Sequence, residues 1–211
     1  MLCAQRGQAV RIIAGSARGK RLLSAPNPAL RPMLDRVKES LFNILRHLVP
    51  GSRVLDLFAG SGAIGLEALS RGADHCVFVE SDPQLLRLAR LNVERCRLLD
   101  RCETLLADAL TLPHRMPPAR GVPAGLVFVD PPYAMVDDPN ARATLFVALE
   151  RMIGAWVSSD AVLVLHHRPL PHALWPTCRL TEWDKRTYGR SQLTFFDVVE
   201  GHDGPNGPAT A

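Results

Sequence analysis

The sequence predicts an α/β fold of the doubly wound type, with a mostly parallel sheet of seven strands that finishes in an antiparallel hairpin. From residue 53 onward, short apolar segments alternate with longer amphipathic ones, an order typical of parallel strands joined by crossover helices. A glycine-rich turn follows the first apolar segment, and an acid with two prolines follows the fourth. In such sheets ligands bind at the carboxyl ends of the strands, so both segments are candidate site loops.

A short N-terminal part precedes this alternation. Apolar-containing segments flank a glycine-rich stretch at 15–19, which predicts a small β-hairpin appendage. A proline-rich link then leads to apolar residues at helical spacing, which predict a helix over 35–47 with Asp35 as a cap near its start. We expect residues 1–9 to be flexible and residues 10–50 to form a basic hairpin and helix packed on the main domain.

The main domain is expected to span residues 51–200. The segment 201–211 is rich in glycine and proline with little apolar content, which predicts a disordered tail. The predicted elements are strands at 54–58, 76–80, 102–106, 126–129 and 161–165, helices at 63–71, 83–97 and 141–153, and hairpin strands at 178–188 and 192–199.

Composition narrows the class of protein. The chain has 211 residues, 47% hydrophobic and 22% charged, which suits one globular domain. The longest apolar runs fall well short of the roughly 20 residues that cross a bilayer, and the N-terminus has no signal-peptide pattern. The five cysteines are scattered without a C-x-x-C pair. These features predict a cytoplasmic monomer with no metal and no membrane contact.

Charge is distributed unevenly along the chain. Residues 1–50 contain nine Lys and Arg residues against two acids, a formal charge of +7. Because the whole chain carries +4, the remainder carries −3. A basic end on a slightly acidic body is typical of an arm that binds a polyanion. We expect the nucleic-acid contacts of this arm to involve Arg11, Arg18, Lys20 and Arg21.

The glycine-rich turn has the spacing of a nucleotide-binding loop. Gly60, Gly62 and Gly65 satisfy G-x-G-x-x-G at a strand-to-helix junction, and Glu80 ends the next predicted strand, where an acid can bind ribose hydroxyls. The spacing alone fits a dinucleotide or S-adenosylmethionine. Asp56 favours the latter, because a carboxylate repels pyrophosphate and attracts a cationic amino-acid group. The chain also has no obvious groups for hydride transfer.

The second loop is Asp130-Pro131-Pro132-Tyr133. Neither proline can continue a strand, because each lacks a backbone N–H. Asp130 and the Pro131 carbonyl can accept both hydrogens of an exocyclic amine, while Tyr133 stacks on the ring that bears it. By contrast, His166 and His167 have no Cys or Glu at ligand spacing, so we expect a structural or rim role for them.

Together these motifs resemble class I S-adenosylmethionine-dependent methyltransferases that act on exocyclic amines. More narrowly, the chain is similar over residues 10–200 to the bacterial 16S ribosomal RNA guanine-N2 methyltransferases of the RsmD type. The blocks that carry the similarity are Arg11-Ile12-Ile13-Ala14-Gly15, Leu30-Arg31-Pro32, Asp35 to Asn43 and Gly65 to Ala73. Met33-Leu34 departs from the pattern where Thr-Thr is expected, which removes hydroxyl groups from that loop.

The resemblance implies a Rossmann-like class I methyltransferase fold, S-adenosylmethionine as cofactor, and 16S rRNA or the small ribosomal subunit as partner. It leaves two alternatives open: an adenine-N6 or cytosine-N4 nucleic-acid methyltransferase, and a non-catalytic RNA-binding assembly factor. By this resemblance the target amine is held by Asp130, Pro131, Pro132 and Tyr133, and the cofactor by Asp56, Phe58, Ala59, Gly60, Ser61, Gly62, Glu80, Ser81, Asp108, Ala109, Arg31, Asp35 and Arg36.

Overall fold

The computed structural model describes residues 10–24, 33–170, 175–177 and 179–199. The predicted flexible N-terminus and tail, and Arg31, lie outside these residues. The order of elements is the predicted alternation of strands and helices, and none of the described helices is long and apolar enough to cross a membrane. In chain order the elements are α1 (Asp35–Ile44), β1 (Arg53–Leu57), α2 (Ala63–Ser70), β2 (His75–Glu80), α3 (Pro83–Cys96), η1 (Leu99–Arg101), β3 (Cys102–Leu106), η2 (Ala109–His114), β4 (Ala124–Val129), α4 (Tyr133–Asp137), α5 (Pro139–Met152), β5 (Val157–His167), β6 (Leu180–Tyr188) and β7 (Ser191–Val198).

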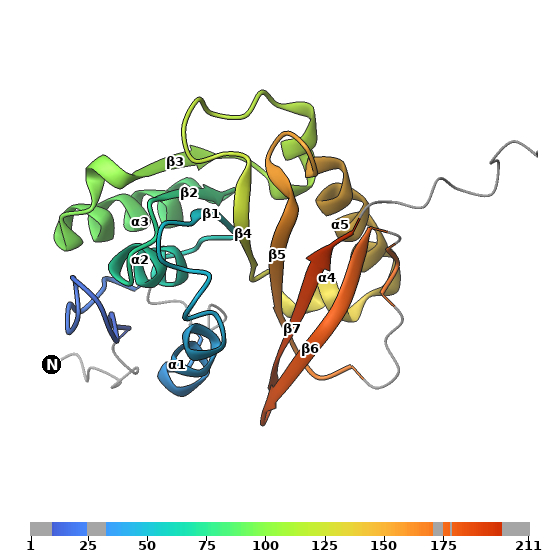
Figure 1. Cartoon of the computed structure of the whole chain (residues 1–211), viewed down its shortest axis with the longest axis horizontal. Coiled ribbons are helices and arrows are strands. Elements are labelled where there is room, and N and C mark those ends of the chain that lie inside the picture. The colour runs from blue at the N-terminus through green and yellow to red at the C-terminus, as the bar shows by residue number, and fades with distance from the viewer. Residues whose placement is uncertain (1–9, 25–32, 171–174, 178, 200–211) are drawn as a thin grey trace, which may run out of the picture.

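A single seven-stranded sheet in the order β3-β2-β1-β4-β5-β7-β6 forms the centre of the molecule (Figure 1). Strands β1 to β5 pair in parallel, whereas β7 pairs antiparallel with both β5 and β6. The predicted α/β class, with its mostly parallel sheet and final antiparallel hairpin, is therefore confirmed. The chain order reverses between β1 and β4, and at such a switch point the loops that follow two neighbouring strands diverge and leave a crevice.

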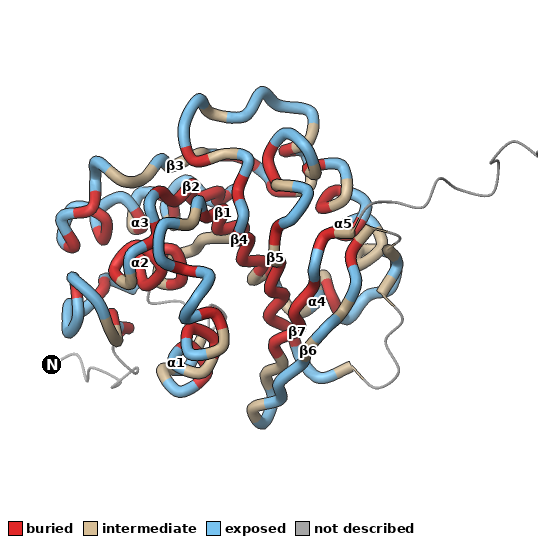
Figure 2. Tube along the Cα trace, viewed as in Figure 1, coloured by how far each residue is buried: buried red, intermediate tan, exposed pale blue. Residues whose placement is uncertain are grey.

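Alternate side chains of the central strands point to opposite faces of the sheet, and each face has its own core. On β1, Val54 belongs to the core shared with the N-terminal segment and helices α1 to α3, whereas Leu55 and Leu57 belong to the core with η2, α4 and α5. Helices thus cover both faces of the sheet, and the central strands are buried along most of their length, whereas the edge strands β3 and β6 are largely exposed or half-buried (Figure 2). Burial on both faces explains why these strands read as continuous apolar runs.

The N-terminal segment packs on the main domain as a compact loop. One antiparallel bridge, Arg11 with Arg21, closes it, so among the described residues the predicted hairpin forms a single bridge and not two extended strands. The buried side chains of this segment, such as Ile12 and Leu22, lie in the same core as α1 and α2. Helix α1 begins after Leu34, which supplies no side-chain cap. The expectation that Asp35 caps this helix was wrong: Asp35 is its first residue and pairs with Arg11 at 2.8 Å.

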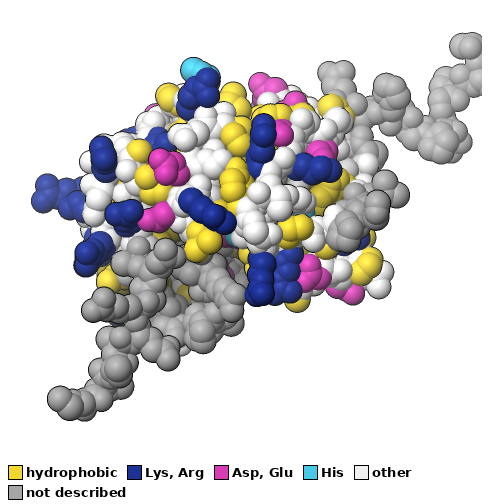
Figure 3. Space-filling model, turned by 90° about the horizontal axis from the view of Figure 1, so that it is seen from below, with side chains coloured by type: hydrophobic (Ala, Val, Ile, Leu, Met, Phe, Trp, Pro, Cys, Tyr) yellow, Lys and Arg dark blue, Asp and Glu magenta, His cyan; other side chains and the backbone are white. Residues whose placement is uncertain are grey.

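Basic side chains mark part of the surface. In the view from below, Lys and Arg side chains gather toward the left end (Figure 3). Arg11, Arg18, Lys20 and Arg21 of the N-terminal loop are all exposed. Arg18, Lys20 and Arg21 therefore present their charges to solvent, whereas Arg11 is paired with Asp35.

Candidate active site

A cleft of about 690 Å³ opens at the carboxyl ends of β1, β2, β4 and β5. Its size suits a small organic ligand, since such sites typically measure roughly 300–1,000 Å³. The glycine-rich turn and the Asp130 loop both contribute to it because β1 and β4 are neighbours in register, with Leu57 beside Val129. The described lining residues are Ser24, Met33, Phe58, Ala59, Gly60, Ser61, Ala63, Ile64, Glu80, Ser81, Leu85, Leu88, Asp130, Pro131, Pro132, Tyr133, His166, Arg168 and Arg190.

The glycine-rich turn brings backbone close to the cleft. Gly62 has a φ of +78° and is the residue before α2 begins, a conformation that glycine adopts without a Cβ penalty. At Gly65 a Cβ would lie 2.5 Å from the Phe78 ring and 2.9 Å from the Asp56 carboxylate. Glycine at this position therefore lets α2 pack directly on the strands and keeps the turn at the sheet edge.

Glu80 ends β2 and lies beside this turn. Its carboxylate accepts backbone N–H groups from Gly60 at 2.8 Å, from Ser81 at 2.8 Å and from Asp82 at 2.9 Å. The Ser81 hydroxyl adds a longer contact of 3.4 Å to Oε1, whereas Oε2 accepts the Gly60 N–H alone among the described residues. Each carboxylate oxygen has about two acceptor positions, so one on Oε2 remains for a ligand hydroxyl. The residue is 7% exposed, and its fixed position suits the ribose-binding role that the resemblance implies.

The Asp130 loop forms the opposite wall. Pro131 and Pro132 end the strand, and α4 begins directly at Tyr133. This short helix was not among the predicted elements. The Asp130 side chain is 28% exposed, and its Oδ1 atom lies 2.7 Å from His166 Nδ1. The Tyr133 ring meets His166 edge-on at 5.8 Å, and the Arg168 guanidinium lies 4.9 Å from its centroid. Part of the Tyr133 ring is thus already in contact with side chains.

Several predicted cofactor residues do not line the cleft. Asp56 is 1% exposed and accepts the Gly65 N–H at 2.9 Å, so it lies behind the glycine-rich turn. Asp108 accepts the Leu110 N–H as the cap of η2, and Ala109 is buried in the adjacent core. Asp35 pairs with Arg11. Of the Arg31 to Arg36 segment, Met33 lines the cleft, whereas Arg36 is exposed outside it.

Three titratable residues of the cleft were not singled out as site residues: His166, Arg168 and Arg190. His166 reaches the cleft because β5 runs parallel to β4 with Leu165 beside Val129, which places the residues after them side by side. The sequence did contain a signal for this contact, since Asp130 and His166 each directly follow an apolar strand segment. To predict the contact from the sequence, one would also have had to pair β5 with β4.

Buried Asp56 has an unusual protonation equilibrium. Burial is the main cause that raises the pKa of its carboxyl to about 8; the Gly65 hydrogen bond opposes this rise, and the nearby charges of Asp130 and Glu80 add to it. The cleft itself is lined by the carboxylates of Glu80 and Asp130, which favour a cationic ligand beside them. Sulfonium and amino groups carry such charges, so these residues fit S-adenosylmethionine.

We expect Asp56→Asn to stabilise the unliganded protein at pH 8. Since the pKa of Asp56 is raised on folding, wild-type stability falls as pH rises from about 4 to about 8, and the amide removes this loss. The gain in unfolding free energy should be on the order of a few kcal/mol at pH 8 and close to zero at pH 4. Urea unfolding at both pH values measures it. Exposed Asp160→Asn is the control, and an equal effect of the two variants would contradict the assignment.

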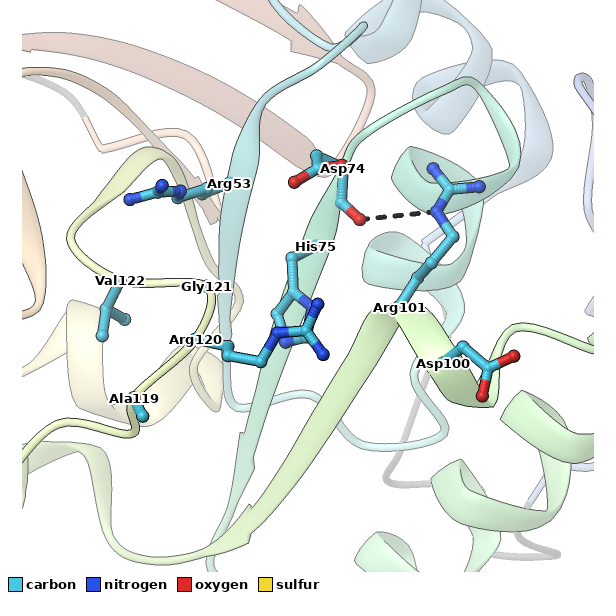
Figure 4. Close-up of a pocket in the computed structure, with 9 residues that line it drawn as sticks. All are labelled: Arg53, Asp74, His75, Asp100, Arg101, Ala119, Arg120, Gly121 and Val122. Atoms are coloured by element: carbon cyan, nitrogen blue, oxygen red, sulfur yellow. Dashed lines mark hydrogen bonds between the residues drawn. The ribbon is translucent and has the colours of Figure 1, made fainter.

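A second hollow of about 290 Å³ lies at the opposite end of the sheet (Figure 4). It adjoins Arg53 and His75, which begin β1 and β2, and Arg120 lies beside the His75 ring. Arg101, Asp74 and Asp100 also line it, so three arginines face two acids. The length of the strands separates this hollow from the glycine-rich turn. Among the described residues, no cluster of three or more His, Cys, Asp or Glu side chains could hold a metal ion.

Comparison with known proteins identifies the family of this chain. The model of a family described as conserved hypothetical protein 95 matches residues 10–197. YlbH of Bacillus subtilis strain 168, provisionally named an rRNA methyltransferase, is 39% identical over 194 residues, which cover 89% of this chain and 98% of that protein. Ribosomal RNA small subunit methyltransferase D of Escherichia coli K12 is 40% identical over 129 residues, 59% of this chain and 60% of that protein.

Solved structures agree with the fold as well. The structure of the Escherichia coli protein yhhF, whose description assigns it provisionally as a methyltransferase, superimposes with a TM-score of 0.76 at 26% identity. The superposition covers 90% of this chain and 98% of that one. The chain therefore belongs to the conserved hypothetical protein 95 family, the RsmD-type S-adenosylmethionine-dependent methyltransferases with a class I fold.

Proposed function

We propose that the protein transfers the methyl group of S-adenosylmethionine to the exocyclic N2 of a guanine in 16S rRNA of the small ribosomal subunit. One observation supports this most directly: the glycine-rich turn with Glu80 and the Asp130 loop line one cleft. Relatives at 39–40% identity carry names that give rRNA as their substrate. A cofactor and an amine bound to the two walls of this cleft would face each other.

The cofactor fits the wall formed by the glycine-rich turn. Glu80 can accept ribose hydroxyls, while Leu85 and Leu88 of α3 offer apolar surface to a planar base. Met33 provides an apolar thioether where the family pattern has a threonine hydroxyl, so contact from this position is van der Waals only. When bound, the cofactor supplies a methyl group on a positively charged sulfur.

Asp130 is the residue that acts on the amine. Its Oδ1 atom is engaged by His166, whereas none of the described residues donates a hydrogen bond to Oδ2. Oδ2 can therefore accept an N–H of the target amine and draw electron density toward that nitrogen. Positive charge develops on the nitrogen as the new bond forms, and a carboxylate at hydrogen-bond distance stabilises that charge more than it stabilises the neutral amine.

The target base must leave its helical stack to reach this cleft. In RNA an unpaired or flipped nucleotide meets that requirement at a cost of a few kcal/mol. Tyr133 offers a ring face to the base, although Arg168 already lies over part of it. Because this guanidinium belongs to an exposed side chain, we expect it to move aside or to stack on the incoming base.

Methyl transfer to unmethylated small-subunit RNA tests the proposal. Ribosomal RNA from a strain that lacks the activity is incubated with the protein and S-adenosylmethionine tritiated in its methyl group, and the RNA is digested to nucleosides. Radioactivity in N2-methylguanosine supports the proposal. Label in N6-methyladenosine or N4-methylcytidine would assign a different base, and RNA binding without label would indicate a non-catalytic assembly factor. Naked RNA and assembled subunits are compared as substrates.

The N-terminal loop should contribute to RNA affinity through phosphate contacts. Arg18 and Lys20 are exposed and close to each other in the loop. Each lost phosphate contact lowers the slope of log K against log salt by about 1, so we expect Arg18→Ala with Lys20→Ala to lower it by about 2. Binding titrations between low and moderate salt measure the slope. Arg95→Ala on exposed α3 is the control, and an unchanged slope in the double variant would exclude the loop.

A further inference from the structure

A buried histidine lies directly behind the carboxylate that acts on the amine. His166 Nδ1 is 2.7 Å from Asp130 Oδ1, and His166 is 4% exposed. The two residues come from neighbouring parallel strands, so the sheet itself fixes their separation. Its Nε2 atom is buried and has no hydrogen-bond partner among the described residues, so the hydrogen bond of the ring is the one to Asp130.

Because of this contact, the two carboxylate oxygens of Asp130 have different surroundings. Oδ1 faces the imidazole, and Oδ2 remains for a ligand in the cleft. Resting on the function proposed above, we propose that His166 is a positioning residue for methyl transfer: as a neutral imidazole that donates its Nδ1 hydrogen, it fixes Asp130 for the amine, and its protonation slows transfer.

Protonation of His166 would act against transfer in two ways. It places a positive charge beside the carboxylate that must stabilise positive charge on the amine, which weakens that stabilisation. It also adds a hydrogen to Nε2, where none of the described residues can accept it, and a buried donor without a partner costs free energy. The neutral form with hydrogen on Nδ1 avoids both penalties.

Other charged and titratable groups surround His166. Tyr133 of α4 meets its ring edge-on, Arg168 follows it on the same strand end, and Glu80 and Arg190 line the same cleft. On β7 the residue paired with His166 is the apolar Leu193. His167 points to Thr194 with its Nε2 atom 2.8 Å from Oγ1, and burial lowers its pKa to about 4, so it stays neutral. Asp130 is thus the acid in direct contact with His166.

The pKa of His166 is raised above its ordinary value by its contact with Asp130. Burial alone would lower the pKa of His166, but the charge of Asp130 and the hydrogen bond to it outweigh burial, so the net shift is upward from its ordinary value. The ordinary value is about 6.5. Transfer should therefore increase as pH rises through this raised pKa, and the low-pH limb of the activity profile should report His166.

The first test needs no activity. The pKa of His166 is measured by NMR titration of the imidazole Cε1–H signals of the unliganded full chain, with the His166 signal assigned from its absence in His166→Asn. Removing an adjacent opposite charge typically shifts a pKa by 1–3 units, so Asp130→Asn should lower the pKa of His166 by about 1 unit or more. Exposed His114 is the internal control and should not shift. An unchanged His166 titration would overturn the coupling.

The second test compares two substitutions. The side-chain amide of His166→Asn can donate a hydrogen bond from near the Nδ1 position but does not titrate, whereas His166→Ala removes the donor. We expect His166→Asn to keep kcat at pH 8 within about tenfold of wild type and to lose the low-pH limb. His166→Ala should lose on the order of 100-fold in kcat, the cost of misplacing a reacting group, with KM for RNA and cofactor affinity nearly unchanged.

Failure of the positioning role can be distinguished from failure of the proposed function. A low-pH limb that persists in His166→Asn, or a His166→Ala kcat within twofold of wild type, would overturn the positioning role while leaving the proposed function intact. If wild-type protein does not methylate RNA at all, the proposed function fails, and the NMR titration still reports whether the pair is coupled. Thermal melts of both variants identify a loss that comes from unfolding.

Discussion

Asp130→Ala is expected to lower kcat for RNA methylation by about 10²–10³-fold, the usual effect of removing one group that stabilises transition-state charge. The reason is differential stabilisation: Oδ2 is needed most when positive charge appears on the amine. Glu80 and the glycine-rich turn, which lie on the other wall, are unaffected by the change. Cofactor affinity should therefore stay within about threefold, and KM for RNA should change little.

Single-turnover kinetics and cofactor titration by calorimetry separate these two effects. Asp130→Asn is the informative companion, because it keeps the size of the side chain and a hydrogen bond to the amine but removes the negative charge. Asp160→Ala is the control: Asp160 is exposed on the same strand as His166, toward its other end. Near-wild-type turnover of Asp130→Ala would place the chemistry elsewhere in the cleft.

Glu67→Ala should cost about 3–5 kcal/mol of unfolding free energy, the usual result of removing one partner of a buried ion pair. Glu67 of α2 is fully buried, with Arg71 Nε at 2.7 Å and Lys38 Nζ at 3.4 Å. It also accepts the backbone N–H groups of Ile13 at 2.7 Å and Ala14 at 3.0 Å. One carboxylate thus joins α1, α2 and the N-terminal loop.

The large effect comes from what the substitution leaves behind. Lys38 is 1% exposed, and burial lowers its pKa while Glu67 opposes that shift. Without Glu67 the ammonium group would remain buried with the Arg11 carbonyl, 2.5 Å from Nζ, as its described partner. Urea unfolding monitored by circular dichroism measures the loss. Exposed Glu94→Ala on α3 should stay within about 0.5 kcal/mol of wild type, and a similarly small effect at Glu67 would refute this role.

Where local signals agree, the sequence predicted the fold closely. The third strand was expected over 102–106 and is found there, and the glycine-rich turn lies at the expected strand-to-helix junction. Parallel strands buried on both faces read as uninterrupted apolar runs, and Pro83 marks the start of α3 by its preference for the first helical turn. These features depend on neighbours in sequence, so they are visible without a structure.

Roles that depend on three-dimensional neighbours were harder to predict. Asp56 was expected to contact the cofactor, but it lies behind the turn because Gly65 packs against it. No helix was predicted around residue 110, yet η2 forms there, capped by Asp108. In both cases a polar side chain is used to satisfy a local backbone N–H, and sequence spacing does not distinguish that use from ligand contact.

By itself, the sequence determined the order of strands and helices, the two loops that carry the site, and the family, because each is encoded by local periodicity or by residues adjacent in the chain. Only the tertiary structure decided that His166 lies 2.7 Å from Asp130 and that Glu67 joins three segments. Strand register and helix packing bring together residues that are 36 and 54 positions apart. No local pattern specifies those distances, since they follow from how the whole sheet is assembled.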